Sequence, residues 1–320
     1  MQYQNQSRPM VEAGILAGVA IMFAFISAYL PIAGAFIHLI WPVPIILLGV
    51  RHGVKWSVMA TVVAGILIAI LLHPLHAVSV VVGFGLTGIV LGHGLRKEYP
   101  PAKTLLWGSA AALISTASVI AIGMFIIGTN PLAIQQEAMT KSVAGAVDFY
   151  RTMGMKEEDL NQMTATMNSA MELMKIILPA GFAMAAIITA YLNLAVAKRI
   201  LKKMGHYIKP FPPFKEWQMP KLSLYAFIVA VLAMYWGQSR EWTWLFNFGV
   251  NLQMIAIVFL LIQGLAVFYY LADKYKLSRL IRGIILFLVF TNGIILQIVL
   301  FAGAVDMAMN YRTRNMRAGD

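Results

Sequence analysis

Long apolar runs separated by short polar connections fill most of the chain. The runs cover about residues 11–30, 35–50, 54–72, 77–95, 104–128, 173–197, 222–238, 245–271 and 283–305. Most approach the roughly 20 apolar residues that a helix needs to cross a bilayer. The pattern therefore predicts an all-α fold, a polytopic membrane helix bundle with eight or nine transmembrane helices.

Two runs leave the number of crossings open. The second run is short and contains Pro42 and Pro44, so it is either kinked or crosses only in part. Thr291-Asn292-Gly293 interrupts the last run, which makes a broken helix one alternative there. If one of these segments fails to cross, the C-terminus lies on the same side of the membrane as the N-terminus.

The composition agrees with a membrane bundle. Sixty percent of the residues are hydrophobic and 12% are charged, whereas a soluble domain is about half apolar and a quarter charged. The formal charge of +12 would suggest nucleic acid in a soluble protein, but the excess of cations in cytoplasmic loops of membrane proteins is a sufficient cause. No nucleic-acid partner is expected. Because the chain has no cysteine, disulfides and thiolate metal sites are excluded.

The distribution of Lys and Arg predicts the orientation. With the N-terminus in the cytoplasm, most of the 25 basic residues fall on the inner side, including seven between Lys198 and Lys221. The expected location is the inner (plasma) membrane, multi-pass, with a cytoplasmic N-terminus. The last crossing alone resists this pattern, because nine crossings would place the basic C-terminal tail outside.

Two long polar connections divide the chain. Residues 129–172 form an outside insertion, where Asn130-Pro131 begins one short amphipathic helix and Gly154 separates it from a second. Residues 199–221 are basic and rich in proline. We therefore expect a six-helix unit at 1–198 that carries the insertion, a cytoplasmic linker at 199–221 and C-terminal membrane helices at 222–320.

The sequence indicates no catalytic chemistry. The first eight apolar runs carry no Asp, Glu, Lys or Arg in their middle, where proton pumps, ion-coupled transporters and intramembrane proteases need ionisable groups. Gly83-Phe-Gly85-Leu-Thr-Gly88 lies within a spanning run, so close helix packing is favoured over dinucleotide binding. Buried amides such as Asn251 and Gln263 are expected to join helices by hydrogen bonds. We expect no enzyme activity, no cofactor and no metal site.

Candidate binding residues cluster near the outer turns of this topology. A solute pocket would be lined by Tyr29, His38, Trp41, His73, His76 and Asn130. The insertion carries flexible Met side chains at helical spacing that suit a movable lid over this pocket, namely Met163, Met167, Met171 and Met174. The alternative is an amphipathic hairpin that rests on lipid headgroups.

Small residues form one stripe of the first helix, at Ala13, Ala17, Ala20 and Ala24. Such stripes let helices approach closely in lipid. The stripe serves either packing within the chain or docking to a separate membrane partner.

Several stretches together resemble a known family. They are Val11-Glu-Ala-Gly-Ile-Leu-Ala-Gly-Val-Ala, Leu48-Gly-Val-Arg-His-Gly-Val-Lys, Lys198-Arg-Ile-Leu, Pro210-Phe-Pro-Pro-Phe-Lys-Glu-Trp-Gln-Met-Pro220, Gln263-Gly-Leu-Ala and Gly303-Ala-Val-Asp-Met-Ala-Met-Asn-Tyr-Arg312. The chain resembles the YybS-like family of bacterial multi-pass membrane proteins. Its N-terminal six helices are similar to the S components of energy-coupling factor (ECF) vitamin transporters. In those components alanines of the first helix dock a second membrane subunit, which implies the same role for the alanine stripe.

Two functions follow as expectations. The first is a small-solute-binding or transport-related membrane subunit without its own energy source. The alternative is a non-transporting membrane scaffold or regulator that binds protein partners. The expected partners are the lipid bilayer, a membrane protein or a second copy of the chain, and an unknown small solute.

Overall fold

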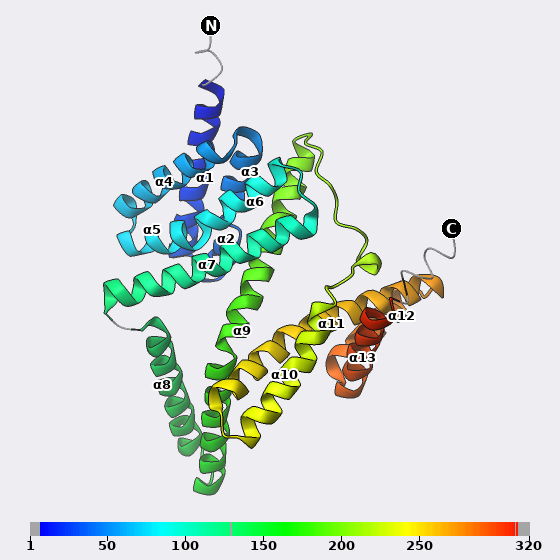
Figure 1. Ribbon diagram of the computed structural model, residues 1–320. Coiled ribbons are helices and arrows are strands. Elements are labelled where there is room, and N and C mark those ends of the chain that lie inside the picture. Colours follow the sequence, from blue (N-terminus) through cyan, green and yellow to red (C-terminus); the bar gives the residue numbers. More distant parts are fainter. Residues whose placement is uncertain (1–6, 129, 311, 313–320) are drawn as a thin grey trace. The chain divides into compact units, whose positions relative to one another are not determined.

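The computed structural model describes residues 7–128, 130–310 and 312, and every regular element among them is helical (Figure 1). The α-helices are α1 (Ser7–Tyr29), α2 (Pro31–Leu39), α3 (Val43–His52), α4 (Val54–Leu71), α5 (Pro74–Val80), α6 (Leu86–Arg96), α7 (Pro101–Ile127), α8 (Pro131–Thr152), α9 (Glu157–Lys203), α10 (Leu222–Ser239), α11 (Thr243–Lys274), α12 (Arg279–Thr291) and α13 (Gly293–Met309). A π-helical turn, η2 (Val81–Gly85), joins α5 to α6, and a 3-10 turn, η3 (Phe214–Glu216), lies in the basic linker.

Among the described residues, seven helices are long and apolar enough to cross a membrane: α1, α4, α5 continued by α6, α7, α9, α10 and α11. Each coincides with one predicted apolar run. The two remaining runs form broken elements, α2 with α3 and α12 with α13. The all-α polytopic membrane bundle predicted from the sequence is therefore confirmed.

The pair α2–α3 returns the chain along α1. Trp41 lies in the break between the two helices, and its indole Nε1 donates to the carbonyl oxygen of Ala20 at 2.8 Å. At the end of α3, Arg51 and His52 contact Glu12 near the start of α1. Because contacts at the break and at the end of α3 both fall on α1, the pair runs antiparallel to α1.

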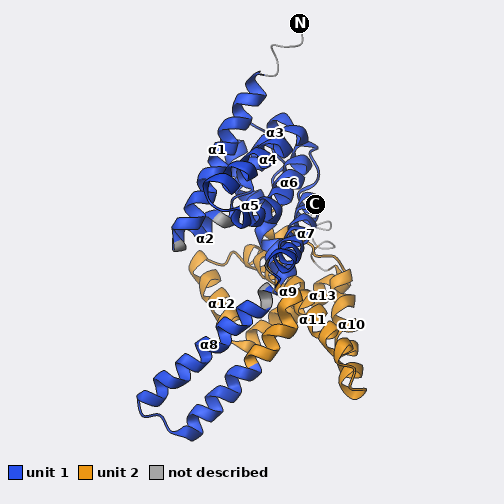
Figure 2. Cartoon of the chain, turned by 90° about the vertical axis from the view of Figure 1, so that its left-hand side faces the viewer, with its two compact units in different colours: residues 1–169, 182–210 blue, residues 170–181, 211–320 orange. Residues whose placement is uncertain are grey.

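The chain divides into two compact units (Figure 2). Unit 1 comprises residues 1–169 and 182–210, and unit 2 comprises residues 170–181 and 211–320. The main division falls within the linker that the sequence marks as a boundary. The segment 170–181 differs from the expectation, because this part of α9 packs with the C-terminal helices.

Close helix contacts hold unit 1 together. A Cβ atom added at Gly92 of α6 would lie only 3.0 Å from the carbonyl oxygen of Ile46 and 3.2 Å from the Cα atom of Gly49 in α3. Glycine therefore allows this close approach of two backbones, where a Cβ atom would be tightly crowded. The glycine-rich run that contains Gly83 and Gly88 is helical, and its packing role is the one predicted.

A side chain of unit 2 supports α9 next to its internal proline, Pro179. Asn251 of α11 donates from Nδ2 to the carbonyl oxygen of Ile176 at 2.6 Å, and its Oδ1 accepts from the backbone N–H of Ala180 at 2.8 Å. Ile176 and Ala180 are four residues apart, the spacing of one backbone hydrogen bond in an α-helix. Asn251 therefore bonds to both backbone groups at the turn that Pro179 disturbs. The predicted hydrogen bonding of buried amides between helices is confirmed here.

The helices α12 and α13 meet at a bend of 104°. Asn292 lies at the bend, and its Oδ1 accepts hydrogen bonds from the backbone N–H groups of Ile294 and Ile295. This N-cap starts α13 in a new direction because it satisfies donors that a continuous helix would pair internally. The broken alternative for the last apolar run is the one that forms.

Both ends of the bent pair reach the same place in unit 2. Arg282 of α12 binds Asp273 at 2.7 Å, and Lys215 of the linker binds the same carboxylate at 2.9 Å. Arg312, which follows α13, donates to the carbonyl oxygen of Lys215. The start of α12 and the residue that follows α13 thus both lie beside Lys215. Among the described residues seven helices, or eight if α12 and α13 form one span, are long and apolar enough to cross a membrane.

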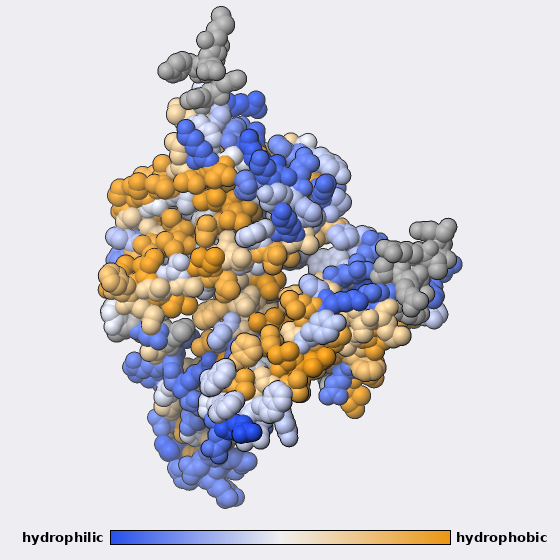
Figure 3. Space-filling view, in the orientation of Figure 1, coloured by the Kyte–Doolittle hydropathy of each residue, from blue (hydrophilic) through white to orange (hydrophobic). Residues whose placement is uncertain are grey.

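Apolar side chains cover the outside of the helices. Figure 3 shows a broad apolar surface over α4, α5 and α7 and a polar surface over α8. Phe125, near the end of α7, is 91% exposed. Such surfaces are costly in water, so they imply a lipid bilayer around the spanning helices.

Candidate functional site

Charged side chains gather at one end of unit 1, where α3, α6 and α9 finish and α7 begins. A Cβ atom at Gly53, just after α3, would lie 2.9 Å from the guanidinium group of Arg96 at the end of α6. Tyr99, in the turn before α7, lines a pocket together with Lys198 of α9 and a groove together with Lys103 of α7. These shared contacts join the ends of several helices into one surface, the basic end.

Glu12 organises the first part of the basic end. Its Oε1 accepts from Arg51 Nη2 at 2.9 Å, and its Oε2 lies 2.6 Å from His52 Nε2. Arg8 approaches the same carboxylate at 3.4 Å from an exposed position. The side chains of Glu12, Arg51 and His52 are all less than one quarter exposed. This cluster ties the start of α1 to the end of α3 and holds two basic side chains at fixed positions.

This cluster was not predicted from the sequence, although both stretches that form it carry the family resemblance. Glu12 belongs to the stretch that begins at Val11, and Arg51 with His52 to the stretch that begins at Leu48. The signal that could have found it is the topology. If α1 and the next run cross once each, the start of the first and the end of the second lie on one side of the membrane.

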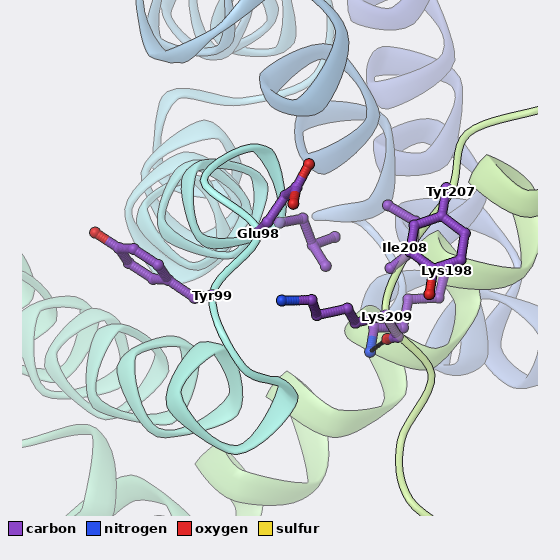
Figure 4. Close-up of a pocket in the computed structure, with 7 residues that line it drawn as sticks. Glu98, Tyr99, Lys198, Tyr207, Ile208 and Lys209 are labelled. Carbon is purple, nitrogen blue, oxygen red and sulfur yellow. Dashed lines mark hydrogen bonds between the residues drawn. The ribbon is translucent and has the colours of Figure 1, made fainter.

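A small pocket lies at the basic end, between the turn after α6 and the end of α9 (Figure 4). Glu98 and Tyr99 come from the turn after α6, Lys198 from the last part of α9, and Tyr207 with Lys209 from the linker. Lys198 Nζ donates to the carbonyl oxygen of Lys209 at 2.9 Å. The cavity volume of about 20 Å³ leaves room for a water molecule but not for a solute.

A larger groove opens on the other side of the same turn. Its volume is about 500 Å³, and it is lined by Val54, Ile89, Val90, His93, Gly94, Tyr99, Lys103, Thr104 and Trp107. The ammonium group of Lys103 lies 4.3 Å from the centre of the Tyr99 ring, and His93 meets the edge of that ring. The groove thus combines an apolar wall with a basic and aromatic rim.

Unit 2 holds a different polar cluster, the buried clasp of Gln263, Asp306 and Arg312. Asp306 accepts from Gln263 Nε2 at 2.6 Å and from Arg312 Nε at 2.9 Å. The side chains of Asp306 and Arg312 are 6% and 1% exposed. A buried ion pair is costly unless its remaining groups are also bonded, and here Gln263 and the backbone complete the set.

The clasp fixes the proline-rich part of the linker onto α11 and α13. Arg312 donates to the carbonyl oxygens of Lys215 and Trp217, and Gln263 Oε1 accepts from the backbone N–H of Met219 at 2.8 Å. Gln263, Asp306 and Arg312 lie in stretches that carry the family resemblance, but their pairing was not predicted from the sequence. No sequence pattern could have indicated it, because three distant segments meet there.

The structure does not gather the residues predicted to line an outer solute pocket. Trp41 is fully buried in the core of unit 1 and bonded to Ala20, so it does not face a pocket. Tyr29 is 70% exposed at the end of α1 and stacks on Phe25. The side chain of His38 lies outside the described part of the structure. The physical reason for the correction at Trp41 is that the indole fills the break between α2 and α3.

The other predicted pocket residues have local roles or are exposed. His73 caps α5 by accepting a hydrogen bond from the backbone N–H of Leu75 at 3.2 Å. His76 lies one turn later, and its Nε2 is buried without a hydrogen-bond partner in the described structure. Asn130 is exposed just before α8. In the described residues no group of three or more His, Cys, Asp or Glu side chains could hold a metal ion.

The alanine stripe of α1 is covered by the chain itself. Ala13, Ala17, Ala20 and Ala24 are 8%, 3%, 0% and 0% exposed, and α1 packs against α2, α3 and α4. The burial favours the first of the two predicted alternatives, packing within the chain.

The predicted insertion is not a pair of short helices. Its first helix is α8, and Gly154, with φ of 84°, lies in the turn that follows. Its second helix is the start of α9, a helix of 47 residues that continues into the membrane-spanning part. At the tip Arg151 binds Glu157 at 3.0 Å, and this hydrogen bond raises the pKa of the arginine above its ordinary value.

The predicted lid methionines lie along this part of α9. Met163, Met167 and Met171 are half-buried, and Met174 is 46% exposed. Val143 of α8 and Leu160 of α9 are buried in the described structure, at 8% and 1% exposure. The lid function therefore stays a prediction.

Comparison with known proteins gives one family and one relative. Residues 18–307 match the family model described as "Predicted membrane protein (DUF2232)". The chain is 21% identical over 313 residues to the "Uncharacterized protein YybS" of Bacillus subtilis (strain 168), across 97% of this chain and 99% of that protein. No solved structure matches. The predicted YybS-like resemblance is confirmed, whereas the similarity to ECF S components stays a prediction.

Proposed function

The chain belongs to the DUF2232 family of predicted membrane proteins, and on that premise we propose that it is a non-transporting membrane scaffold or regulator. Its basic linker, residues 199–221, faces the cytoplasm and binds protein partners. This is the second of the two functions that the sequence suggests. The proposal also places the N-terminus in the cytoplasm and the chain in the plasma membrane.

The buried clasp is the observation that carries the proposal. A linker that only connects two groups of helices needs no fixed conformation. Here Arg312, Gln263 and Asp306 hold the backbone of residues 215–219 in place through buried charged and amide groups. Holding the backbone of residues 215–219 at this cost is useful if the segment presents a defined surface to another molecule.

The arrangement of the other candidate residues supports the same choice. A solute-binding subunit needs a concave site with a few convergent polar groups. The expected lining residues instead fill the core, cap a helix or face outward, as Trp41, His73 and Tyr29 do. The alternative function is small-solute binding, as the resemblance to ECF S components implies. The experiment below distinguishes it from the scaffold function.

Site-specific photocrosslinking in cells tests the proposal. Tyr207 lies in the linker and is 83% exposed, and Phe125 near the opposite end of unit 1 is 91% exposed. Each is replaced by benzoylphenylalanine, so the two variants are matched in size and exposure. We expect a discrete protein adduct from position 207 and only lipid adducts from position 125. No protein adduct at 207, together with solute uptake by vesicles that contain the purified chain, would support the transport alternative.

Cysteine labelling tests the orientation on which the proposal depends. The chain has no cysteine, so Lys203→Cys and Met309→Cys each introduce one thiol at an exposed position. Both should react with an impermeant reagent only after the inner face is opened. Labelling of Lys203→Cys in intact cells would reverse the orientation. Labelling of Met309→Cys in intact cells, without labelling of Lys203→Cys, would show that α12 and α13 together make one further crossing.

A further inference from the structure

We propose that the groove between the ends of α4, α6 and α7 binds an anionic phospholipid. The phosphate of the lipid lies at the rim formed by Lys103, His93 and Tyr99, and an acyl chain lies along the wall formed by Val54, Ile89, Val90 and Trp107. The inference is independent of the proposed scaffold function, because it concerns a lipid rather than a protein partner.

The size and lining of the groove fit one lipid segment. About 500 Å³ is far more than water molecules alone would need, and three aliphatic side chains and one indole line it. Ile89 and Val90 are only partly buried, and Trp107 is 56% exposed. An apolar groove of this kind on a membrane helix bundle is filled by hydrocarbon rather than by water.

The charge of the rim selects the headgroup. Lys103 and His93 line the groove, and no Asp or Glu is among its lining residues. The ammonium group of Lys103 is held over the face of Tyr99 at 4.3 Å, which positions the cation without neutralising it. A fixed and uncompensated cation attracts a negatively charged headgroup more than a zwitterionic one.

The position of the aromatic side chains fits the depth of a headgroup. Tyr99 lies in the turn before α7, and Trp107 follows two turns into that helix. Tyr and Trp are enriched at the membrane–water interface because their rings are amphipathic. The rim and the wall of the groove therefore span the boundary between headgroups and acyl chains. A free phosphate ion would contact the rim alone and would leave the apolar wall uncovered.

Titration of the purified protein in detergent with phosphatidylglycerol and phosphatidylcholine, followed by native mass spectrometry, tests the site. We expect phosphatidylglycerol to bind more tightly than phosphatidylcholine. Lys103→Gln should weaken phosphatidylglycerol binding about fivefold, the effect of one cation near an anionic headgroup. Lys202→Gln is the matched control, because Lys202 is an exposed lysine near the end of α9 that does not line the groove; it should leave binding unchanged.

A second measurement follows the acyl chain. Phosphatidylglycerol with brominated acyl chains should quench the fluorescence of Trp107, and this component should be lost in Trp107→Phe. Equal binding of the two lipids, equal effects of Lys103→Gln and Lys202→Gln, or quenching that is unchanged in Trp107→Phe would each overturn the proposal. Displacement of the lipid by equimolar inorganic phosphate would also overturn it, because the rim would then bind a free anion. Unchanged thermal unfolding of Lys103→Gln excludes a folding defect.

Discussion

The two units close their interiors by different means. In unit 1 small alanines on α1 lie against neighbouring helices, and the charged cluster of Glu12 stays at the rim, partly open to solvent. In unit 2 a charged pair, Asp306 and Arg312, lies inside the fold. Charge at the rim keeps part of its hydration, whereas a buried charge depends entirely on its partners. The difference teaches that charged side chains stabilise unit 1 weakly, where they are partly exposed. In unit 2, where they are buried, they determine the conformation of the chain around them.

The largest expected effect comes from breaking the buried clasp. Asp306→Asn leaves the guanidinium of Arg312 buried without a countercharge, and such a loss typically costs about 3–5 kcal/mol. We expect a large drop in the thermal unfolding temperature of the protein in detergent. We also expect the linker near Trp217 to become accessible to protease.

The control for this variant is Asp273→Asn. Asp273 binds two cations, Lys215 and Arg282, whereas Asp306 binds one, but the side chain of Asp273 is 40% exposed. Solvent compensates the lost charge there, so the unfolding temperature should change little. An equal effect of the two variants would show that burial does not separate the two carboxylates, and the comparison of the units would fail.

A smaller effect is expected where helices of unit 2 cross closely. A Cβ atom at Gly264 would overlap the backbone carbonyl of Val299, so Gly264→Ala should destabilise the protein by about 1–3 kcal/mol through overpacking. Gly283→Ala is the control, since nothing lies within 4 Å of that position in α12. Alanine in a helix interior is more favourable than glycine by roughly 0.5–1 kcal/mol, so this variant should unfold at an equal or higher temperature.

The alanine stripe of unit 1 gives a parallel test. Ala20 is fully buried, and Ala20→Leu adds carbon atoms where α2, α3 and α4 pack against α1. We expect a loss of about 1–3 kcal/mol from overpacking. Ala28→Leu on the same helix is exposed and should be tolerated. Wild-type unfolding of Ala20→Leu would mean that the stripe faces lipid or a separate partner.

The smallest effect should come from the cluster around Glu12 in unit 1. Glu12→Gln removes the charge that faces Arg51 and His52 but leaves a side chain that still accepts hydrogen bonds. Because all three side chains are partly exposed, the expected loss is about 1 kcal/mol or less. Thermal unfolding at low and at high salt measures it, and the difference from wild type should shrink at high salt. A loss as large as that of Asp306→Asn would show that the Glu12 cluster stabilises the protein as strongly as the buried clasp does.

Helix positions could be read from the sequence, whereas contacts between helices could not. Seven of the nine apolar runs match helices long enough to span, because a bilayer requires about 20 apolar residues in each crossing helix, and the other two runs form broken helices. The break near Pro42 and the interruption at Asn292 were also visible, because proline and asparagine have known local effects on helices. The candidate site could not be predicted, because the pocket prediction relied only on which residues lie near the same turns. Position in the sequence does not show which way the side chain of Trp41 points.

The sequence by itself determined the helical class, the membrane environment and the cationic linker, because each depends on local composition and on the thickness of the bilayer. Only the tertiary structure decided that the last two helices return to Lys215 and that Arg312 closes the clasp. It also decided that the groove forms beside Lys103. These features depend on which segments meet after folding. A carboxylate at position 306 is an ordinary polar residue until the fold removes it from water and leaves Gln263 and Arg312 as its partners.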